Sequence, residues 1–279
     1  MASPSVGTVR EALAAATDAL AAAGVEAPRL DADVLLAAAT RWDRARLAAE
    51  PEETVDAGAA RRFGEMVRRR VRREPVAYIL GRKGFRRLEL AVDGRALIPR
   101  PETELLVEIA LELEPRTALD VGTGSGAVAL AVADELPECE VTGTDTSTTA
   151  LDLARENSER LGIEGRVRFE RGTVPEGRHF DLVLANLPYV GEDEWHRLAP
   201  EITGYEPREA LVAGADGVEA IAATVPAALT ALNPGASLAL EVGAGQAGPV
   251  AELLVDLGFS QVEGRQDLAG IARVVLASR

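Results

Sequence analysis

The stretch Asp120-Val121-Gly122-Thr123-Gly124-Ser125-Gly126 decides how the rest of this chain is interpreted. It follows an apolar run that favours a β-strand over residues 117–121. It precedes a run rich in alanine and valine that favours a helix over residues 127–135. Glycine permits positive φ angles and lets a ligand approach the backbone closely, and the start of a helix offers free N–H groups. The turn therefore predicts a site for a carboxylate or a pyrophosphate.

The turn alone does not identify its ligand, because it also satisfies the dinucleotide-binding pattern with Ala127 as the last member. Asp145 ends the next expected strand. A carboxylate there can accept hydrogen bonds from two ribose hydroxyls, or it can cap the helix that follows. Asp120 either orients the loop or reaches the ligand. An NAD enzyme and a methyltransferase both remain possible at this point.

A second string, Asn186-Leu187-Pro188-Tyr189, ends another apolar strand. An amide or aromatic amine nitrogen has a delocalised lone pair and attacks a methyl group poorly. The Asn186 side-chain oxygen and the Leu187 carbonyl can accept both N–H bonds of such a group and hold it in line with a sulfonium methyl. Tyr189 can stack on the planar group, and Pro188 keeps Leu187 extended. Together the two strings predict methyl transfer from S-adenosylmethionine.

From residue 117 onward the apolar pattern alternates between strand and helix. Strands are expected over residues 117–121, 140–144, 167–170, 181–185, 236–242, 260–266 and 271–277. Helices are expected over residues 127–135, 148–161, 217–232 and 247–257. This alternation is typical of an open, mostly parallel sheet with helices on both faces. Ligands then bind at the carboxyl ends of the strands.

Residues 1–80 have a helical pattern that contains no group of catalytic side chains. Thr8-Val9-Arg10-Glu11 fits a capping box, and Pro28 fits the start of a second helix. Further helices are expected near residues 41–48 and 55–72, and four short helices can form a small bundle. Residues 81–98 favour a β-hairpin linker. The arginine-rich run 68–73 favours a solvated helix face over a docking patch.

The composition excludes several classes of function. The net charge of −15 argues against sequence-independent binding to nucleic acid, so we expect no direct nucleic-acid contact. A single cysteine, Cys139, excludes an intrachain disulfide, and two histidines make a metal site improbable, so none is expected. The chain shows no signal-peptide pattern and no apolar run of membrane-spanning length, so we expect a cytoplasmic protein without a membrane partner.

The chain resembles the class I S-adenosylmethionine-dependent methyltransferases, and more narrowly the HemK-like peptide chain release factor N(5)-glutamine methyltransferases. The resemblance covers nearly the whole chain. Besides the two strings above, it is carried by Pro28–Ala32, Glu74–Gly81, Leu97–Glu104, Tyr205–Arg208 and Asp267–Gly270. It implies a Rossmann-like α/β domain with a mostly parallel, seven-stranded sheet over residues 99–279. A helical substrate-recognition domain over residues 1–80 and a hairpin linker over residues 81–98 precede it.

The resemblance also implies a reaction and its participants. In this family the helical domain helps to dock a class I release factor, and the catalytic domain methylates the glutamine of its Gly-Gly-Gln loop with S-adenosylmethionine. Substrate contacts are implied at Asn186, Leu187, Pro188 and Tyr189. Cofactor contacts are implied at Gly122, Thr123, Gly124, Ser125, Gly126, Asp145, Thr173 and Asn186. Arg100 and Glu102 are implied to fold over the cofactor, and Glu206 either lines the substrate entrance or makes a loop contact.

Two positions depart from the family pattern. Relatives usually read Asn-Pro-Pro-Tyr, and here Leu187 replaces the first proline. Leucine keeps the carbonyl that accepts the hydrogen bond, but it adds an N–H and bulk that can alter the substrate. Gly172-Thr173 stands where relatives commonly carry acidic and aromatic residues. The contacts to adenine implied at this position therefore depart from the family pattern.

Three other functions fit part of the sequence. The motif Asn-Leu-Pro-Tyr also occurs in adenine dimethylases acting on ribosomal RNA, so adenine N6-methylation of RNA or DNA is the main alternative. It requires a basic surface that an acidic chain does not favour, and it leaves residues 1–105 unexplained. An NAD-dependent oxidoreductase leaves Asn186 unexplained. A chain that binds a partner without methylating it is the third alternative.

Overall fold

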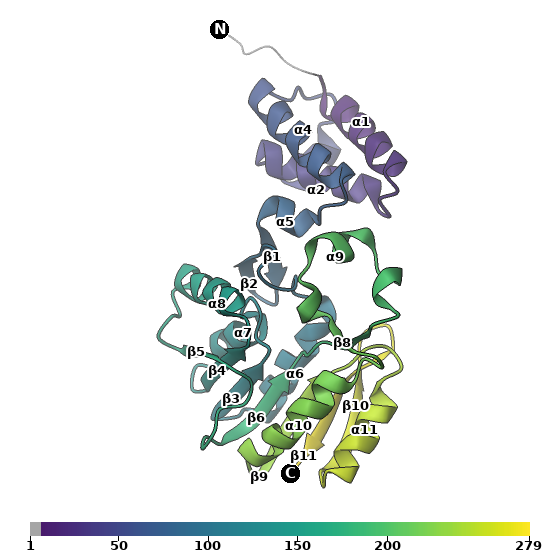
Figure 1. Ribbon diagram of the computed structural model, residues 1–279. Helices are drawn as coiled ribbons and strands as arrows, with labels where there is room; N and C mark the ends of the chain where they lie inside the picture. The colour runs from purple at the N-terminus through teal and green to yellow at the C-terminus, as the bar shows by residue number, and fades with distance from the viewer. Residues whose placement is uncertain (1–6) are drawn as a thin grey trace. The chain divides into compact units, whose positions relative to one another are not determined.

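The computed structural model describes residues 7–279, which form two compact units (Figure 1). The first unit contains the described residues up to Gly81 and a returning segment, Ala199–Tyr205. The second contains Arg82–Leu198 and Glu206–Arg279. The hairpin expected as a linker therefore belongs to the second unit, and the returning segment belongs to the first.

The first unit is a bundle of short helices around an apolar core. Its helices are α1 (Val9–Ala22), α2 (Pro28–Thr40), α3 (Arg44–Ala49), α4 (Ala57–Val71), α5 (Val76–Leu80) and α9 (Pro200–Tyr205). The expected capping box is confirmed: the Thr8 hydroxyl accepts from the Glu11 N–H, and the Glu11 carboxylate accepts from the Thr8 N–H. Leu13, Leu20 and Phe63 are among the side chains that fill the core.

The arginine-rich run 68–73 is not a solvated face throughout, so that part of the sequence interpretation is wrong. Arg70 is only 7% exposed. Its guanidinium lies 2.6 Å from the Asp31 carboxylate and 2.7 Å from that of Glu201. Arg73 also pairs with Glu201, at 2.7 Å. Because a buried charge needs a counter-charge, these pairs hold α9 in the first unit.

The second unit is built on a sheet of seven strands in the order β10-β11-β9-β6-β3-β4-β5. The strands are β3 (Thr117–Val121), β4 (Glu140–Asp145), β5 (Val167–Arg171), β6 (Phe180–Ala185), β9 (Leu232–Glu241), β10 (Ser260–Gln266) and β11 (Ala272–Ser278). Six of them run in the same direction, and β11 is antiparallel to both of its neighbours, β9 and β10. The expected mostly parallel, seven-stranded sheet is confirmed.

Helices cover both faces of this sheet (Figure 1). One face packs against α6 (Glu104–Leu113), α7 (Ala127–Glu135) and α8 (Thr148–Leu161), and the other against α10 (Glu219–Ala231) and α11 (Ala247–Asp256). Along β6, Leu182 and Leu184 join the first core, whereas Val183 and Ala185 join the second. The strand is apolar at every one of these positions because both of its faces are buried.

Smaller elements connect the main ones. The expected hairpin is formed by β1 (Arg82–Phe85) and β2 (Leu88–Ala91). Further short elements are β7 (Val190–Gly191), β8 (Val212–Gly214) and the 3₁₀ turns η1 (Pro101–Thr103), η2 (Trp195–Arg197) and η3 (Arg208–Ala210). The short pair β7–β8 is absent from the sequence prediction. Within residues 7–279 no helix is both long and apolar enough to cross a membrane.

Candidate active site

The carboxyl ends of β3, β4 and β6 open onto one cavity of about 340 Å³ in the second unit. The glycine turn after β3, the residues after β4 and β5, and the loop after β6 all contribute to its walls. Of the expected site residues, those that line it are Gly122, Thr123, Gly124, Ser125, Asp145, Thr173, Asn186, Leu187 and Pro188. The strand order therefore brings most of the two sequence strings together.

The glycine turn is held by backbone hydrogen bonds to β4. The N–H groups of Gly122 and Thr123 donate to the Thr144 carbonyl at 2.8 and 2.9 Å. Gly122 and Gly124 have φ angles of 76° and 57°, which glycine adopts without strain. The turn is thus anchored through its backbone to the end of β4.

Asp120 lies directly beneath this turn. Its Oδ2 accepts from the Thr123 hydroxyl at 2.6 Å and from the Ala129 N–H at 3.2 Å. Burial raises the pKa of the Asp120 carboxyl to about 6. Of its two expected roles, orienting the loop is the one these contacts show, and Asp120 also lines the cavity.

Asp145 faces the cavity at the end of β4. One carboxylate oxygen accepts from the Gly124 N–H at 2.9 Å, and the other accepts from the Ser147 N–H at 2.8 Å. The side chain that caps α8 is that of Ser147, which accepts from the Ala150 N–H. Since an ionised carboxylate has about four acceptor positions, Asp145 keeps capacity for a ligand.

Gly126 is not among the residues that line the cavity. Its N–H donates to the Thr123 carbonyl at 2.8 Å. A Cβ at this position would lie 2.9 Å from a Leu130 methyl and 3.2 Å from the Ala154 Cβ. Gly126 therefore serves the close packing of α7 against α8.

The part of the cavity wall that follows β5 in the chain is formed by the small residues Gly172 and Thr173. Gly172 donates its N–H to the Asp145 carbonyl at 2.9 Å, which places this wall beside the end of β4. A Cβ on Gly172 would have no neighbour within 4 Å. This side of the cavity is consequently more open than a large aromatic side chain would leave it.

The Asn186 loop presents an oriented amide to the cavity. The Asn186 Nδ2 donates to the Thr103 hydroxyl oxygen at 3.1 Å, so the Oδ1 is left as an acceptor. Leu187 is 7% exposed and packs into the core on the α10 face. A Cβ on Gly122 would lie 3.4 Å from a Leu187 methyl, which shows that the two loops touch.

Tyr189 does not line the cavity. Its carbonyl accepts from the Gln246 Nε2 at 2.9 Å, and a Cβ on Gly243 would lie 3.2 Å from its ring. Burial raises the pKa of the Tyr189 hydroxyl to about 12. The ring thus packs against the turn after β9, and stacking on a substrate stays a prediction.

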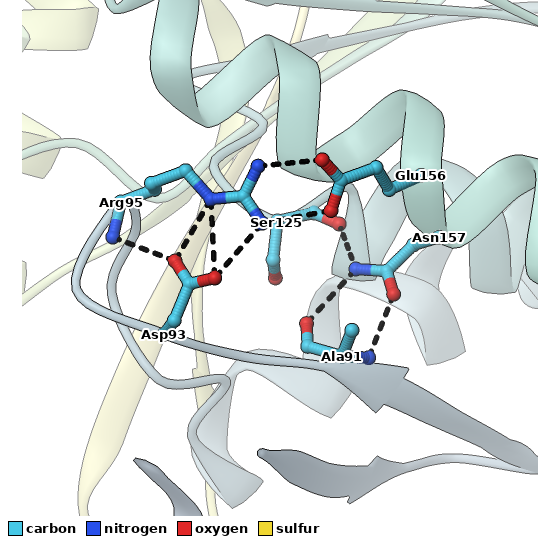
Figure 2. A network of polar contacts seen from close by, with 6 residues as sticks. All are labelled: Ala91, Asp93, Arg95, Ser125, Glu156 and Asn157. Atoms are coloured by element: carbon cyan, nitrogen blue, oxygen red, sulfur yellow. Dashed lines mark hydrogen bonds and ion pairs between the residues drawn. The ribbon is translucent and has the colours of Figure 1, made fainter.

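Residues 95–100 form a strap that lines another side of the cavity. Figure 2 shows how the start of this strap is fastened to α8. Arg95 bonds both Asp93 and Glu156, with distances of 2.7–3.1 Å. The Asn157 amide exchanges hydrogen bonds with both backbone groups of Ala91 and also donates to the Ser125 carbonyl at 3.0 Å. One buried side chain therefore joins the hairpin, α8 and the glycine turn.

The other end of the strap is bound by Glu206. Its carboxylate accepts from the Ile98 N–H at 3.0 Å and from the Arg100 guanidinium at 2.5 Å. Glu206 itself is buried and is not among the cavity-lining residues, so of its two expected roles the loop contact is observed. Arg100 lines the cavity, whereas Glu102 does not.

The roles of Asn157, Thr103 and Glu241 were not predicted from the sequence. Thr103 lies inside Leu97–Glu104, one of the segments that carry the family resemblance, and Glu241 is the one charged residue in an apolar strand. A charge in such a run is a usable signal, because charged side chains are rarely fully buried without a partner.

Two family models match this chain. The PrmC N-terminal domain matches residues 11–81, and the methyltransferase small domain matches residues 101–203. Among solved structures, a methyltransferase from Pyrococcus furiosus aligns with a TM-score of 0.53 at 21% identity, covering 68% of this chain and 88% of that one. The hMettl16 catalytic domain in complex with an RNA hairpin aligns with a TM-score of 0.57 at 14% identity, covering 68% and 74%. These likenesses show the fold alone.

Full-length relatives are more informative. The release factor glutamine methyltransferase of Geobacter sulfurreducens is 40% identical, covering 98% of this chain and 97% of that protein. Those of Koribacter versatilis and Moorella thermoacetica are 38% and 40% identical, each covering 98% of this chain and 99% of the relative. The resemblance noted in the sequence is therefore confirmed, and this chain belongs to the release factor glutamine methyltransferase family.

Proposed function

We propose that this protein transfers the methyl group of S-adenosylmethionine to the side-chain amide nitrogen of the glutamine in the Gly-Gly-Gln loop of a class I release factor. The observation that carries the proposal is the contact between the glycine turn and the Asn186 loop on one cavity, with the Asn186 Nδ2 bonded to Thr103. An acceptor oxygen is thereby left for a substrate amide beside the expected cofactor turn.

The residues present fit S-adenosylmethionine. The turn from Gly122 to Ser125 gives the cofactor a close approach to the backbone, and the Asp145 carboxylate has free acceptor capacity for ribose hydroxyls. Gly172 and Thr173 leave room for a base beside them. When bound, the cofactor supplies an electrophilic methyl group on a sulfonium sulfur.

The protein's own contribution to the reaction is orientation. The Asn186 Oδ1 and the Leu187 carbonyl accept the two N–H bonds of the substrate amide. Accepting both bonds fixes the direction of the nitrogen and favours the positive charge that develops on it. Pro188 limits the backbone of Leu187 to extended geometry, which aims that carbonyl.

We assign recognition of the release factor to the first unit. Its helices form a separate core, and the cavity that carries the two sequence strings lies entirely in the second unit. The names of the full-length relatives and the match of their N-terminal domain over residues 11–81 support this assignment.

The test is incubation of the protein with a purified class I release factor and methyl-labelled S-adenosylmethionine, followed by peptide mass spectrometry. We expect one added methyl group, located on the glutamine of the Gly-Gly-Gln loop. A release factor with that glutamine changed to glutamate is the control and should stay unlabelled. Label in ribosomal RNA instead would favour adenine methylation, and cofactor binding without any transfer would favour a binding protein.

A further inference from the structure

A buried carboxylate lies beside the Asn186 loop and has no part in the function proposed above. Ala185 of β6 is paired with Leu240 of β9. The residues that follow them, Asn186 and Glu241, are therefore neighbours at the ends of these parallel strands. Glu241 is 2% exposed. It ends β9 at the same edge of the sheet at which the cavity opens.

This carboxylate is only half satisfied. The neighbouring Thr103 hydroxyl favours the charged form of Glu241 and so acts to lower its pKa, while the Glu241 Oε2 has no hydrogen-bond partner among the residues that the structure describes. The two nearby cations are bound elsewhere, since Arg100 pairs with Glu206 and Arg273 pairs with Asp267. A buried acceptor without a partner costs free energy, so stability does not explain a glutamate here.

Thr103 is a neighbour of both Glu241 and Asn186. A threonine hydroxyl has a single proton, and an ionised carboxylate can only accept. A Thr103 hydroxyl that donates to Glu241 can only accept from Asn186, which matches the 3.1 Å bond from the Asn186 Nδ2. We propose that Glu241 is a positioning residue that acts through Thr103 to set which end of the Asn186 amide faces the substrate.

The direction of this relay depends on the charge of Glu241. Burial raises the pKa of Glu241 to about 7; Thr103, Arg273 and Arg100 act against this rise, and Glu102 adds to it. Tyr189 is the remaining titratable neighbour, and it stays neutral below its pKa of about 12. A protonated Glu241 donates a hydrogen bond to the Thr103 oxygen. The Thr103 hydroxyl then donates to the Asn186 Oδ1, which requires the Asn186 amide to rotate by about half a turn. The active orientation therefore requires the carboxylate.

The inference rests on the proposed function, because it concerns the amide that is assigned to the substrate. The first experiment measures kcat, the KM for release factor and the cofactor Kd for Glu241→Gln between pH 5.5 and 8.5. In the wild type we expect kcat to rise with pH through about 7. Glutamine mimics the protonated acid, so the variant should lose that step and have a kcat about 10- to 100-fold lower at pH 8. Its KM and cofactor Kd should stay within about twofold, because orientation rather than binding is affected.

Thr103 variants separate a relay from a direct role of Glu241. Thr103→Ser keeps the hydroxyl and should keep both the activity and the pH step. Thr103→Val should lose activity, and adding Glu241→Gln to it should cause no further loss. If the activity losses of the two single variants multiply in the double variant, the relay is overturned. A wild-type kcat for Glu241→Gln at pH 8 would overturn it as well.

A measurement without turnover keeps the two proposals distinct. The side-chain N–H₂ signals of Asn186, assigned by their disappearance in Asn186→Ala, can be followed by NMR during a pH titration. They should titrate near pH 7 in the wild type and stay constant in Glu241→Gln. Constant signals in the wild type would overturn the inference, whether or not the release factor is the substrate. Absent methyl transfer with titrating signals would overturn only the proposed function.

Discussion

The two loops that meet at the cavity are held in place by different means. The glycine turn has backbone bonds to the adjacent strand β4, through Gly122 and Thr123, in addition to its bonds with the side chains of Asp120, Asp145 and Asn157. The Asn186 loop depends on side chains that are remote in sequence: Thr103, 83 residues earlier, and Gln246, 57 residues beyond Tyr189. The first loop therefore has backbone support that persists when a side chain changes, whereas the second loop depends on a few individual side chains.

The largest effect is expected from Asn186→Ala. It removes the acceptor oxygen, so kcat should fall by about a thousandfold or more, as when a group that acts in the transition state is lost. Labelled methyl transfer to release factor measures kcat, and circular dichroism and the cofactor Kd test whether fold and cofactor binding persist. Activity within about twofold of the wild type would contradict the role of Asn186.

Asp145→Ala tests the cofactor side of the comparison. It removes the proposed acceptor for the ribose and one bond to the Gly124 N–H. We expect the cofactor Kd to rise about 10- to 100-fold, as for the loss of charge-assisted hydrogen bonds. Titration calorimetry measures this, with Asp152→Ala on the exposed face of α8 as the matched control. Equal affinities of the two variants would remove Asp145 from the site.

Gly126→Ala tests the rigidity of the glycine turn. The new Cβ would lie 2.9 Å from a Leu130 methyl, and the residue has a φ of 83°. Overpacking and a positive φ should together lower the free energy of unfolding by about 2–4 kcal/mol. Gly162→Ala is the control, because it shares the positive φ but has no atom within 4 Å. Equal losses in urea denaturation would show that packing at Gly126 is unimportant.

Glu241→Gln tests how the buried carboxylate beside the Asn186 loop affects the free energy of unfolding. The folded-state pKa of Glu241 is about 7, above its usual value of 4.5, because of burial. The folded protein therefore holds a proton that the unfolded chain releases, and stability decreases as pH rises from about 4.5 to 7. Relative to the wild type, the variant should gain about 1–3 kcal/mol between pH 5 and pH 8. A difference in unfolding free energy that is independent of pH would contradict the raised pKa.

The smallest effect is expected from Leu187→Pro, which restores the residue usual in the family. The carbonyl that accepts the substrate hydrogen bond is kept, while some buried apolar contact with the α10 face is lost. We expect kcat to change by no more than about threefold. A loss above tenfold would mean that this site is adapted to a different substrate.

Much of the fold follows from the sequence, because long periodic segments carry strong signals. The helices Ala127–Glu135 and Thr148–Leu161 have the bounds expected from their patterns, and all seven main strands are found. The short elements α5 and β7 are missed, since a few residues contain no measurable period. The pairing of Arg70 is missed because its partners, Asp31 and Glu201, are remote in sequence.

The candidate site is predictable to a similar extent. The glycine turn, Asp145 and Asn186 are found because each follows a strand, and the ends of parallel strands meet at one edge. The proximity of Thr103 to Glu241 and the bond from Asn157 to Ser125 are not predictable from the sequence. They join side chains whose proximity exists only after the sheet and its helices have packed.

The returning segment Ala199–Tyr205 has a consequence for anyone who builds chimaeras of this protein. A fragment cut at Gly81 would lose Glu201, the carboxylate shared by Arg70 and Arg73, and would leave the nearly inaccessible Arg70 with half of its counter-charge. The N-terminal helices are thus not an independently exchangeable module. A transplant between relatives needs two pieces of chain, the N-terminal one and the short excursion that ends at Tyr205.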